Sequence, residues 1–225
     1  WDLPDEFNPA VDFLRKHDDC DSTALEYLSP AGERASYSFR ELDERSDRLA
    51  AGLRDLGVGP GDRVGVVVPQ KPQNPITHLA NWKLGALSVP LSVLYGPDAL
   101  QYRLADADAK AVVVEAAVRD EIDEARVDCP ALEHVIEIET GAPAGDAVAF
   151  EDALTEPGAS VDPYDATPDT ESAILYTSGS TGPPKGVLHS HALWLGRAAA
   201  SYNYMDRGLG PDAMVWTPSD WAWGS

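Results

Sequence analysis

The chain has 225 residues, of which 44% are hydrophobic, so it can bury the core of one large domain or two small ones. Its formal net charge of -21, from 38 acidic and 17 basic residues, argues against binding to nucleic acid, where phosphate contacts need Lys and Arg. The sequence shows no apolar run long enough for a membrane span and no signal segment at its start. These features predict a cytoplasmic protein.

Short apolar runs alternate with amphipathic stretches along the chain, and turn residues separate them. Ser38 and Glu41 form a capping box, which marks the start of a helix with Leu42, Leu49 and Leu53 on one face. In chain order, the expected elements are a strand at 24–28, a helix at 38–56, a strand at 63–68, a helix at 75–84, a strand at 85–91, a helix at 97–105, a strand at 110–114, a helix at 119–126, strands at 134–138 and 172–177, a helix at 190–204 and a strand at 213–217.

This alternation predicts an α/β fold with layered, largely parallel sheets flanked by helices. The stretch 140–169 is rich in Gly, Pro, Ala and acidic residues, and we interpret it as a surface loop with one helical turn at 150–154. We expect a subdomain boundary in this loop. The chain begins at Trp1 and stops shortly after an expected strand, so we expect it to be part of a longer protein.

The charge pattern and the cysteines bear on the environment of the protein. Only 5 of the 17 basic residues are Lys, and the acidic residues are spread along the chain. An acidic surface with few Lys predicts adaptation to high salt, because salt screens like-charge repulsion; an ordinary acidic cytosolic protein is the alternative. Cys20 and Cys129 are too few for a disulfide framework, and no Cys or His cluster has the spacing of metal ligands. We therefore predict reduced thiols and no metal site.

A glycine-rich loop follows the strand expected at 172–177. Its glycines let the backbone approach a ligand, successive amides can form an anion-binding concavity, and hydroxyls and a Lys add further donors. The residues that we predict to bind phosphate are Thr177, Ser178, Gly179, Ser180, Thr181, Gly182, Pro183, Pro184 and Lys185. A flexible polar linker is the alternative, but such a linker has no need of the stiff Pro-Pro-Lys sequence.

The loop does not match the Walker A pattern G-x-x-x-x-G-K-[ST]. Pro184 stands before Lys185 where the pattern has Gly, and Gly186 follows where it has Ser or Thr. The hydroxyl that would hold magnesium in a Walker A loop is therefore missing.

Residues 176–191, YTSGSTGPPKGVLHSH, resemble the signature of the adenylate-forming superfamily, which includes acyl-CoA synthetases, firefly luciferases and the adenylation domains of peptide synthetases. GVGPGDRVGVVVP at 57–69 and LANWKLGALSVPL at 79–91 resemble two earlier blocks of the same family. The resemblance covers most of the chain from about Tyr37 onward. It implies that 1–225 is the N-terminal portion of an AMP-binding (adenylation) domain, with the C-terminal domain absent.

The resemblance implies a two-step ligase reaction with ATP, Mg²⁺ and coenzyme A. A carboxylic acid, of the fatty type in our interpretation, would react with ATP to form an acyl-adenylate. The acyl group would then pass to the thiol of coenzyme A. The loop would hold the β- and γ-phosphates of ATP. An adenylation module of a peptide-synthetase-like or other carrier-linked system is the alternative. The family residues that contact adenine and ribose, and the C-terminal Lys, have no counterpart here. We therefore predict no catalytic residue within 1–225 and no activity for these residues alone.

A second block, WTPSDWAWG at 216–224, resembles the S/A-D-x-G-W block of acetyl- and medium-chain acyl-CoA synthetases, with Ala222 where Gly is commoner. Trp221 and Trp223 are candidates for a substrate pocket; core or interface aromatics are the alternative. His189 and His191 are candidate bases, but we favour a role in fixing the loop at the start of the following helix. The oligomeric state stays open.

Overall fold

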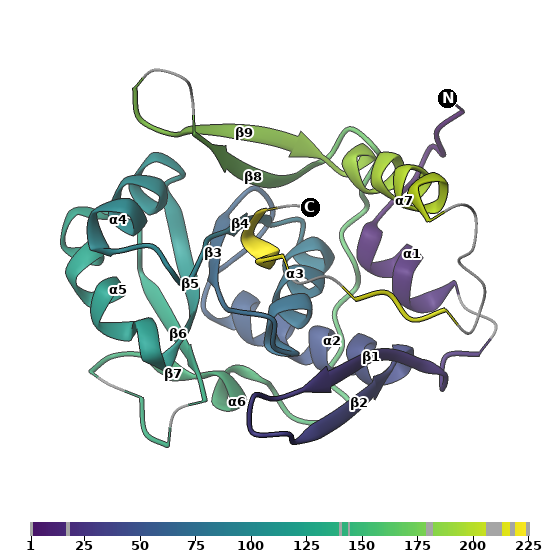
Figure 1. The fold of residues 1–225 in the computed structure, drawn as a ribbon, viewed down its shortest axis with the longest axis horizontal. Helices are drawn as coiled ribbons and strands as arrows, with labels where there is room; N and C mark the ends of the chain where they lie inside the picture. Colours follow the sequence, from purple (N-terminus) through teal and green to yellow (C-terminus); the bar gives the residue numbers. More distant parts are fainter. Residues whose placement is uncertain are drawn as a thin grey trace.

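A large sheet of mostly parallel strands organises the computed structural model, which describes residues 2–16, 19–139, 141–143, 145–178, 182–205, 213–216 and 219–223 (Figure 1). Within these residues its strand order is β7-β6-β5-β3-β4-β8-β9, and all neighbours are parallel except β8 and β9. The strands are β3 (Arg63–Val67), β4 (Leu87–Pro90), β5 (Ala109–Glu115), β6 (His134–Ile138), β7 (Val148–Ala149), β8 (Glu171–Thr177) and β9 (Lys185–Ser190).

Helices cover both faces of this sheet. The helices are α1 (Pro9–Arg15), α2 (Phe39–Asp55), α3 (Gln73–Leu84), α4 (Pro97–Asp106), α5 (Arg119–Ala125), α6 (Phe150–Ala153) and α7 (Ala192–Tyr204). Buried residues of α1, α2, α3 and α6 share one core cluster, and those of α4 and α5 share another. No helix in the described ranges combines the length and the apolar composition needed to cross a membrane.

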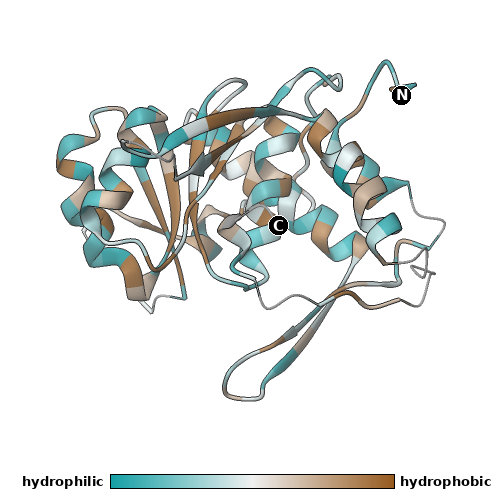
Figure 2. Cartoon of the chain, turned by 45° about the horizontal axis from the view of Figure 1, so that its top comes forward, coloured by the Kyte–Doolittle hydropathy of each residue, from teal (hydrophilic) through white to brown (hydrophobic). Residues whose placement is uncertain are grey.

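The core follows from the alternation of side chains along the strands. In β5, Ala111 and Val113 join the cluster beneath α2 and α3, whereas Val112 and Val114 join the cluster beneath α4 and α5. Successive residues of a strand point to opposite faces, so a run of valines supplies both cores at once. Figure 2 shows the hydrophobic colour along these strands. The α/β fold with largely parallel strands is therefore confirmed.

The capping box predicted for α2 is present. The Glu41 amide donates to Ser38 Oγ at 3.2 Å, and the Ser38 amide donates to Glu41 Oε2 at 2.8 Å. These bonds satisfy donors that have no partner inside the helix. The helix then buries its predicted apolar face, including Leu42, Leu49 and Leu53.

Four local expectations from the sequence were wrong or incomplete. Helix α1 was not predicted, because it has only seven residues. β1 (Thr23–Leu28) pairs with β2 (Arg34–Ser38), an unpredicted strand, in a separate two-stranded sheet that projects from the body (Figure 2). Strand β9 occupies residues that we expected to be loop, so α7 begins two residues later than predicted.

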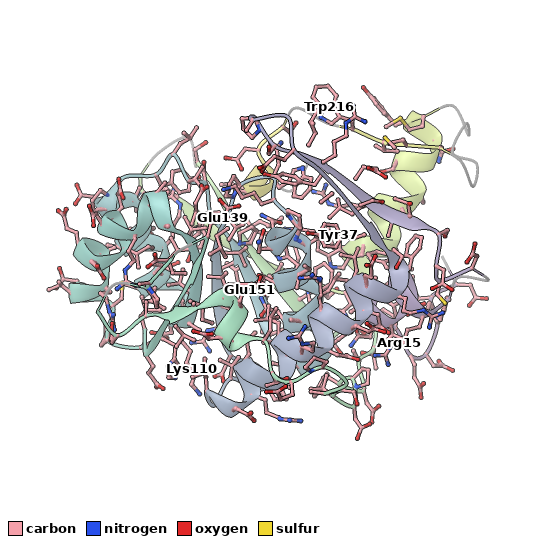
Figure 3. All side chains as sticks on the ribbon, turned by 90° about the horizontal axis from the view of Figure 1, so that it is seen from below. Arg15, Tyr37, Lys110, Glu139, Glu151 and Trp216 are labelled. Atoms are coloured by element: carbon pink, nitrogen blue, oxygen red, sulfur yellow. The ribbon has the colours of Figure 1, made fainter. Side chains whose placement is uncertain are left out.

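The strand predicted at 213–217 is also absent from residues 213–216, and 217 lies outside the described residues. Its side chains are exposed, Trp216 to 80%, and Trp216 lies at the rim of the molecule in Figure 3. Apolar side chains without a neighbouring strand to pair with do not form a ladder, whatever their propensity.

The stretch predicted as a long loop contains β7 and α6 and then packs along the body. Val161 and Ala166 are buried, the Tyr164 amide donates to the Lys83 carbonyl at 2.8 Å, and the Phe7 amide donates to the Ala166 carbonyl at 2.8 Å. This stretch therefore ties α1 to α3. A subdomain boundary in 140–169 stays a prediction.

A buried cluster of charges joins the helices on one face of the sheet. The Lys83 side chain of α3 is fully buried, and its Nζ lies 2.6 Å from Asp43 Oδ1 and 2.7 Å from Asp47 Oδ1 of α2. Arg15 of α1, which lies against α2 in Figure 3, donates from Nε to Asp43 Oδ2 at 2.9 Å and from Nη2 to Asp47 Oδ2 at 3.1 Å. Two positive groups thus neutralise two carboxylates where three helices meet.

We expect Lys83→Met to destabilise the full-length protein by about 3–5 kcal/mol, because it leaves Asp43 and Asp47 partly buried with one cation between them. Lys16→Met is the matched control, since Lys16 pairs with Asp12 at the surface, and it should change stability by less than about 1 kcal/mol. Urea unfolding midpoints measure both. Equal midpoints for the two variants would contradict the structural role of the cluster.

Candidate functional site

The predicted phosphate loop joins the two strands of a β-hairpin. β8 and β9 pair antiparallel, with Tyr176 opposite Gly186 and Thr177 opposite Lys185. The structure therefore places Thr177, Ser178, Gly182, Pro183, Pro184 and Lys185 at the turn of this hairpin. Gly179, Ser180 and Thr181 lie outside the described residues. A strand follows the loop, and not the helix that follows a Walker A loop, so the geometry agrees with the mismatch in sequence.

Lys185 differs from the other lysines in its surroundings. Lys16, Lys71, Lys83 and Lys110 each form an ion pair with at least one carboxylate. Lys185 is exposed, and within the described ranges no carboxylate pairs with its ammonium group. In a chain with a net charge of -21, a cation left free at the mouth of a glycine-rich loop is available for an anionic ligand.

Glycine is required at the position opposite Tyr176. A Cβ atom on Gly186 would lie 2.9 Å from Ile174 Cγ2 and 3.2 Å from Tyr176 Cζ. The Tyr176 ring therefore packs across the backbone of Gly186. This pair lies next to Thr177 and Lys185, the pair that closes the loop. Cross-strand packing of an aromatic ring on glycine fixes the register of a hairpin.

The hairpin also contacts α4. The Tyr102 hydroxyl donates to the Pro184 carbonyl oxygen at 3.0 Å, and the Tyr176 hydroxyl donates to Asp106 Oδ2 at 2.7 Å, with the Arg103 carbonyl oxygen 3.1 Å away. Burial raises the pKa of Tyr176, and the hydrogen bond to Asp106 adds to that effect, so the hydroxyl keeps its proton. Sequence reasoning missed these partners, because they lie about 70–80 residues from the hairpin.

Residues 219–223 of the second predicted block lie beside the carboxyl ends of β3 and β4. Gln70, which follows β3, donates from Nε2 to the Ser219 carbonyl oxygen, and Ser92, which follows β4, donates from Oγ to Asp220 Oδ2 at 2.5 Å. Asp220 Oδ1 also accepts from the Ala222 amide at 3.0 Å, at the start of the short 3₁₀ turn Trp221–Trp223. In open α/β sheets this edge is the usual place for ligands.

Among the described residues, no hydrogen bond or ion pair joins the two predicted parts of the site. Trp221 is half-buried, and the side chain of Trp223 lies outside the description. Figure 1 shows the 221–223 turn beside β4, whereas the loop end of the hairpin lies over α4. The pocket role of Trp221 and Trp223 and the phosphate role of the loop both stay predictions.

The two histidine candidates occupy different environments. His189 lies half-buried on β9, opposite Ala173. His191 caps α7, is fully buried, and its Nδ1 lies 3.1 Å from the Phe7 carbonyl oxygen. Burial lowers the pKa of His191, although the contact with Phe7 acts in the opposite direction. A buried, neutral His191 that ties the N-terminal segment to α7 has a structural role and is not placed to serve as a base.

Comparisons with known proteins cover nearly the whole chain. A family model described as AMP-binding enzyme matches residues 14–224. The acetyl-coenzyme A synthetase of Laribacter hongkongensis is 31% identical over 244 residues, which cover 99% of this chain and 37% of that protein.

Solved structures agree with this match. The acetoacetyl-CoA synthetase from Streptomyces lividans gives a TM-score of 0.86 at 27% identity, over 97% of this chain and 35% of the other. An anthranilate CoA ligase in complex with anthranoyl-AMP gives a TM-score of 0.79 at 27% identity, over 88% of this chain and 37% of the other. The chain thus spans about a third of the length of the proteins it matches.

We expect Gly186→Ala to destabilise the full-length protein by about 1–3 kcal/mol, because the added methyl group overlaps Ile174 and Tyr176. Gly196→Ala is the control, since a Cβ there meets nothing within 4 Å and helix α7 favours Ala by about 0.5–1 kcal/mol. Unfolding midpoints should move in opposite directions. A Gly186→Ala variant as stable as wild type would contradict the close packing of the hairpin.

Stability should fall as the pH is lowered from about 6.5 towards 5. Burial lowers the pKa of His78 to about 4 and also lowers that of His191, whereas an unfolded His titrates near 6.5. Between these values the unfolded chain binds more protons than the folded one, so acid favours unfolding. Urea midpoints across this range measure the slope, which a His78→Gln/His191→Gln variant should reduce. A flat wild-type profile would show that neither histidine is held neutral.

Proposed function

Because this chain belongs to the family of AMP-binding enzymes, as the resemblance of residues 176–191 predicted, we propose that the full-length protein is an acyl-CoA synthetase that uses ATP to activate a carboxylic acid. The observation that carries the proposal is the placement of Lys185. It ends a glycine-rich loop and has no carboxylate partner in the described part of the chain, whereas each of the other four lysines pairs with a carboxylate.

The proposed reaction has two steps. A carboxylate oxygen attacks the α-phosphorus of ATP, which forms the acyl-adenylate and releases pyrophosphate. The thiol of coenzyme A then attacks the acyl carbon, loses its proton, and displaces AMP to give the thioester. The first step is needed because a free carboxylate is a poor electrophile, whereas AMP is a good leaving group.

The loop contributes position and charge to this reaction. Its hydroxyls and amides are donors suited to phosphate oxygens, and Lys185 adds a positive charge where charge accumulates on the leaving pyrophosphate. Holding the β- and γ-phosphates in this way orients the α-phosphorus for attack, and the loop itself needs no general base.

Magnesium would enter with the nucleotide. In the described ranges, no group of three or more His, Cys, Asp or Glu side chains could hold a metal ion. Mg²⁺ bound to the triphosphate would spread the negative charge that the loop and Lys185 face.

We infer a plain carboxylic acid, of the fatty type, as the substrate. Hydrogen bonds from Gln70 and Ser92 anchor residues 219–223 at the carboxyl ends of β3 and β4. This anchoring supports the half-buried Trp221 as an apolar wall of the substrate pocket. Asp220 accepts hydrogen bonds from Ser92 Oγ and the Ala222 amide, so each oxygen of its carboxylate already has a partner within the protein. This arrangement favours an acid without an amino group over an amino acid.

The chain alone should be inactive, since it spans about a third of the length of its relatives. We also propose a cytoplasmic location and adaptation to high salt. The net charge of -21 and the five lysines among 17 basic residues support the latter, because screening by salt would weaken self-repulsion.

The direct test is acid-dependent exchange of pyrophosphate into ATP by the full-length protein, with acids from acetate through medium-chain to aryl acids. We expect exchange with at least one of them, and we expect Lys185→Ala to lower kcat/KM for ATP by about 100-fold through loss of the charge on the phosphates.

Lys16→Ala provides the matched control, because it removes a surface lysine far from the hairpin in sequence. Exchange that depends only on amino acids would favour a carrier-linked adenylation module. An unchanged kcat/KM in Lys185→Ala would overturn the assignment of the loop, and exchange by residues 1–225 alone would overturn their predicted inactivity.

A further inference from the structure

The hairpin that carries the loop extends beyond the strand that supports it. β4 has only four residues, and its register with β8 pairs Ser88 with Ala173, near the start of β8. The later residues of β8, from Ile174 to Thr177, pair with β9 on their other side. Figure 1 shows the two strands crossing the top of the molecule, with the loop end over α4. A two-stranded ribbon is only marginally stable without further packing, so the loop end needs another support.

Helix α4 supplies that support at both ends of the loop. On the outgoing side, the Tyr102 hydroxyl holds the carbonyl oxygen of Pro184, the residue before Lys185, at 3.0 Å. On the incoming side, the Tyr176 hydroxyl donates to Asp106 Oδ2 at 2.7 Å, one residue before Thr177. Two hydrogen bonds with one helix thus hold Tyr176 and Pro184, one residue at each end of the loop.

The Arg103 side chain completes the contact between the helix and the hairpin. It is buried, and its Nη1 donates to the Ala99 carbonyl oxygen at 2.7 Å, which holds it along the helix. Its guanidinium carbon lies 4.2 Å from the ring centroid of Tyr95 and 5.7 Å from that of Tyr176. The Arg103 guanidinium lies over both rings and restricts the orientation of the Tyr176 side chain. The Tyr176 hydroxyl is therefore held in the orientation that reaches Asp106.

We propose that α4 is a brace for the phosphate loop, in which Tyr102, Tyr176 and Asp106 are positioning residues that set the distance between the two ends of the loop. This inference rests on the proposed function of the loop. A loop whose ends are already held loses less conformational freedom when a triphosphate binds to it, so the brace acts on the binding of ATP and not on the binding of the acid.

The test uses Tyr102→Phe and Tyr176→Phe in the full-length protein, each of which removes one hydroxyl and keeps the ring. We expect KM for MgATP to rise about five- to tenfold in each, as loss of one hydrogen bond allows, with KM for the acid unchanged. Trypsin should cleave the bond after Lys185 several-fold faster in both variants, as measured by mass spectrometry of the peptides.

Two further variants separate positioning from a general loss of stability. Asp106→Asn keeps an oxygen acceptor for Tyr176 and should behave as wild type, whereas Asp106→Ala should resemble Tyr176→Phe. Tyr27→Phe, on β1, removes a hydroxyl that has no partner in the described residues, and it should change neither KM nor tryptic cleavage.

The outcomes distinguish the brace from the function of the loop. Unchanged KM for MgATP and unchanged cleavage in an active enzyme would overturn the brace and leave the proposed function intact. An equal rise in KM for both substrates, together with a lower unfolding midpoint, would also overturn it, since that result indicates a purely structural contact. If wild type shows no acid-dependent exchange, the proposed function fails, and the tryptic cleavage rates alone then decide whether α4 fixes the loop.

Discussion

The antiparallel pairing of β8 with β9 is the interaction on which the candidate site depends. It brings Thr177 opposite Lys185, so the glycine-rich loop connects two paired strands. Gly186 permits that pairing because the Tyr176 ring lies across it, and Tyr176 in turn reaches α4 through its hydroxyl. The Tyr176–Gly186 pair therefore sets the register of the hairpin, and Tyr176 also attaches the hairpin to α4.

The distribution of positive charge follows from the scarcity of lysine. The fully buried Lys83 balances two carboxylates of α2. Lys71, which follows β3, pairs with Glu115, the last residue of β5, and with Glu139, which follows β6. The charges of Lys71 and Lys83 are therefore already neutralised by carboxylates of the protein. Lys185 lies instead at the turn of a hairpin, where the described neighbours offer it no carboxylate. In the described residues, carboxylates thus pair with the other four lysines and leave the Lys185 ammonium without an ionic partner.

Sequence reasoning recovers what is encoded locally. The capping box at Ser38 and the valine run of β5 involve neighbours in sequence, and both were predicted with nearly correct bounds. β9 was not predicted, because Val187 and Leu188 are both exposed and its residues show no apolar alternation. The contacts of α4 with the hairpin were out of reach for another reason. They join residues about 70–80 positions apart, and only the crossing of the hairpin over the helix brings them together.

The central claim is that the β8–β9 loop binds the triphosphate of ATP. A crystal structure of the full-length protein with a non-hydrolysable ATP analogue and Mg²⁺ tests it most directly. We expect the β- and γ-phosphates within hydrogen-bonding distance of the loop between Thr177 and Lys185, with the Lys185 ammonium among their contacts. A triphosphate bound elsewhere, with this loop and Lys185 facing solvent, would contradict it.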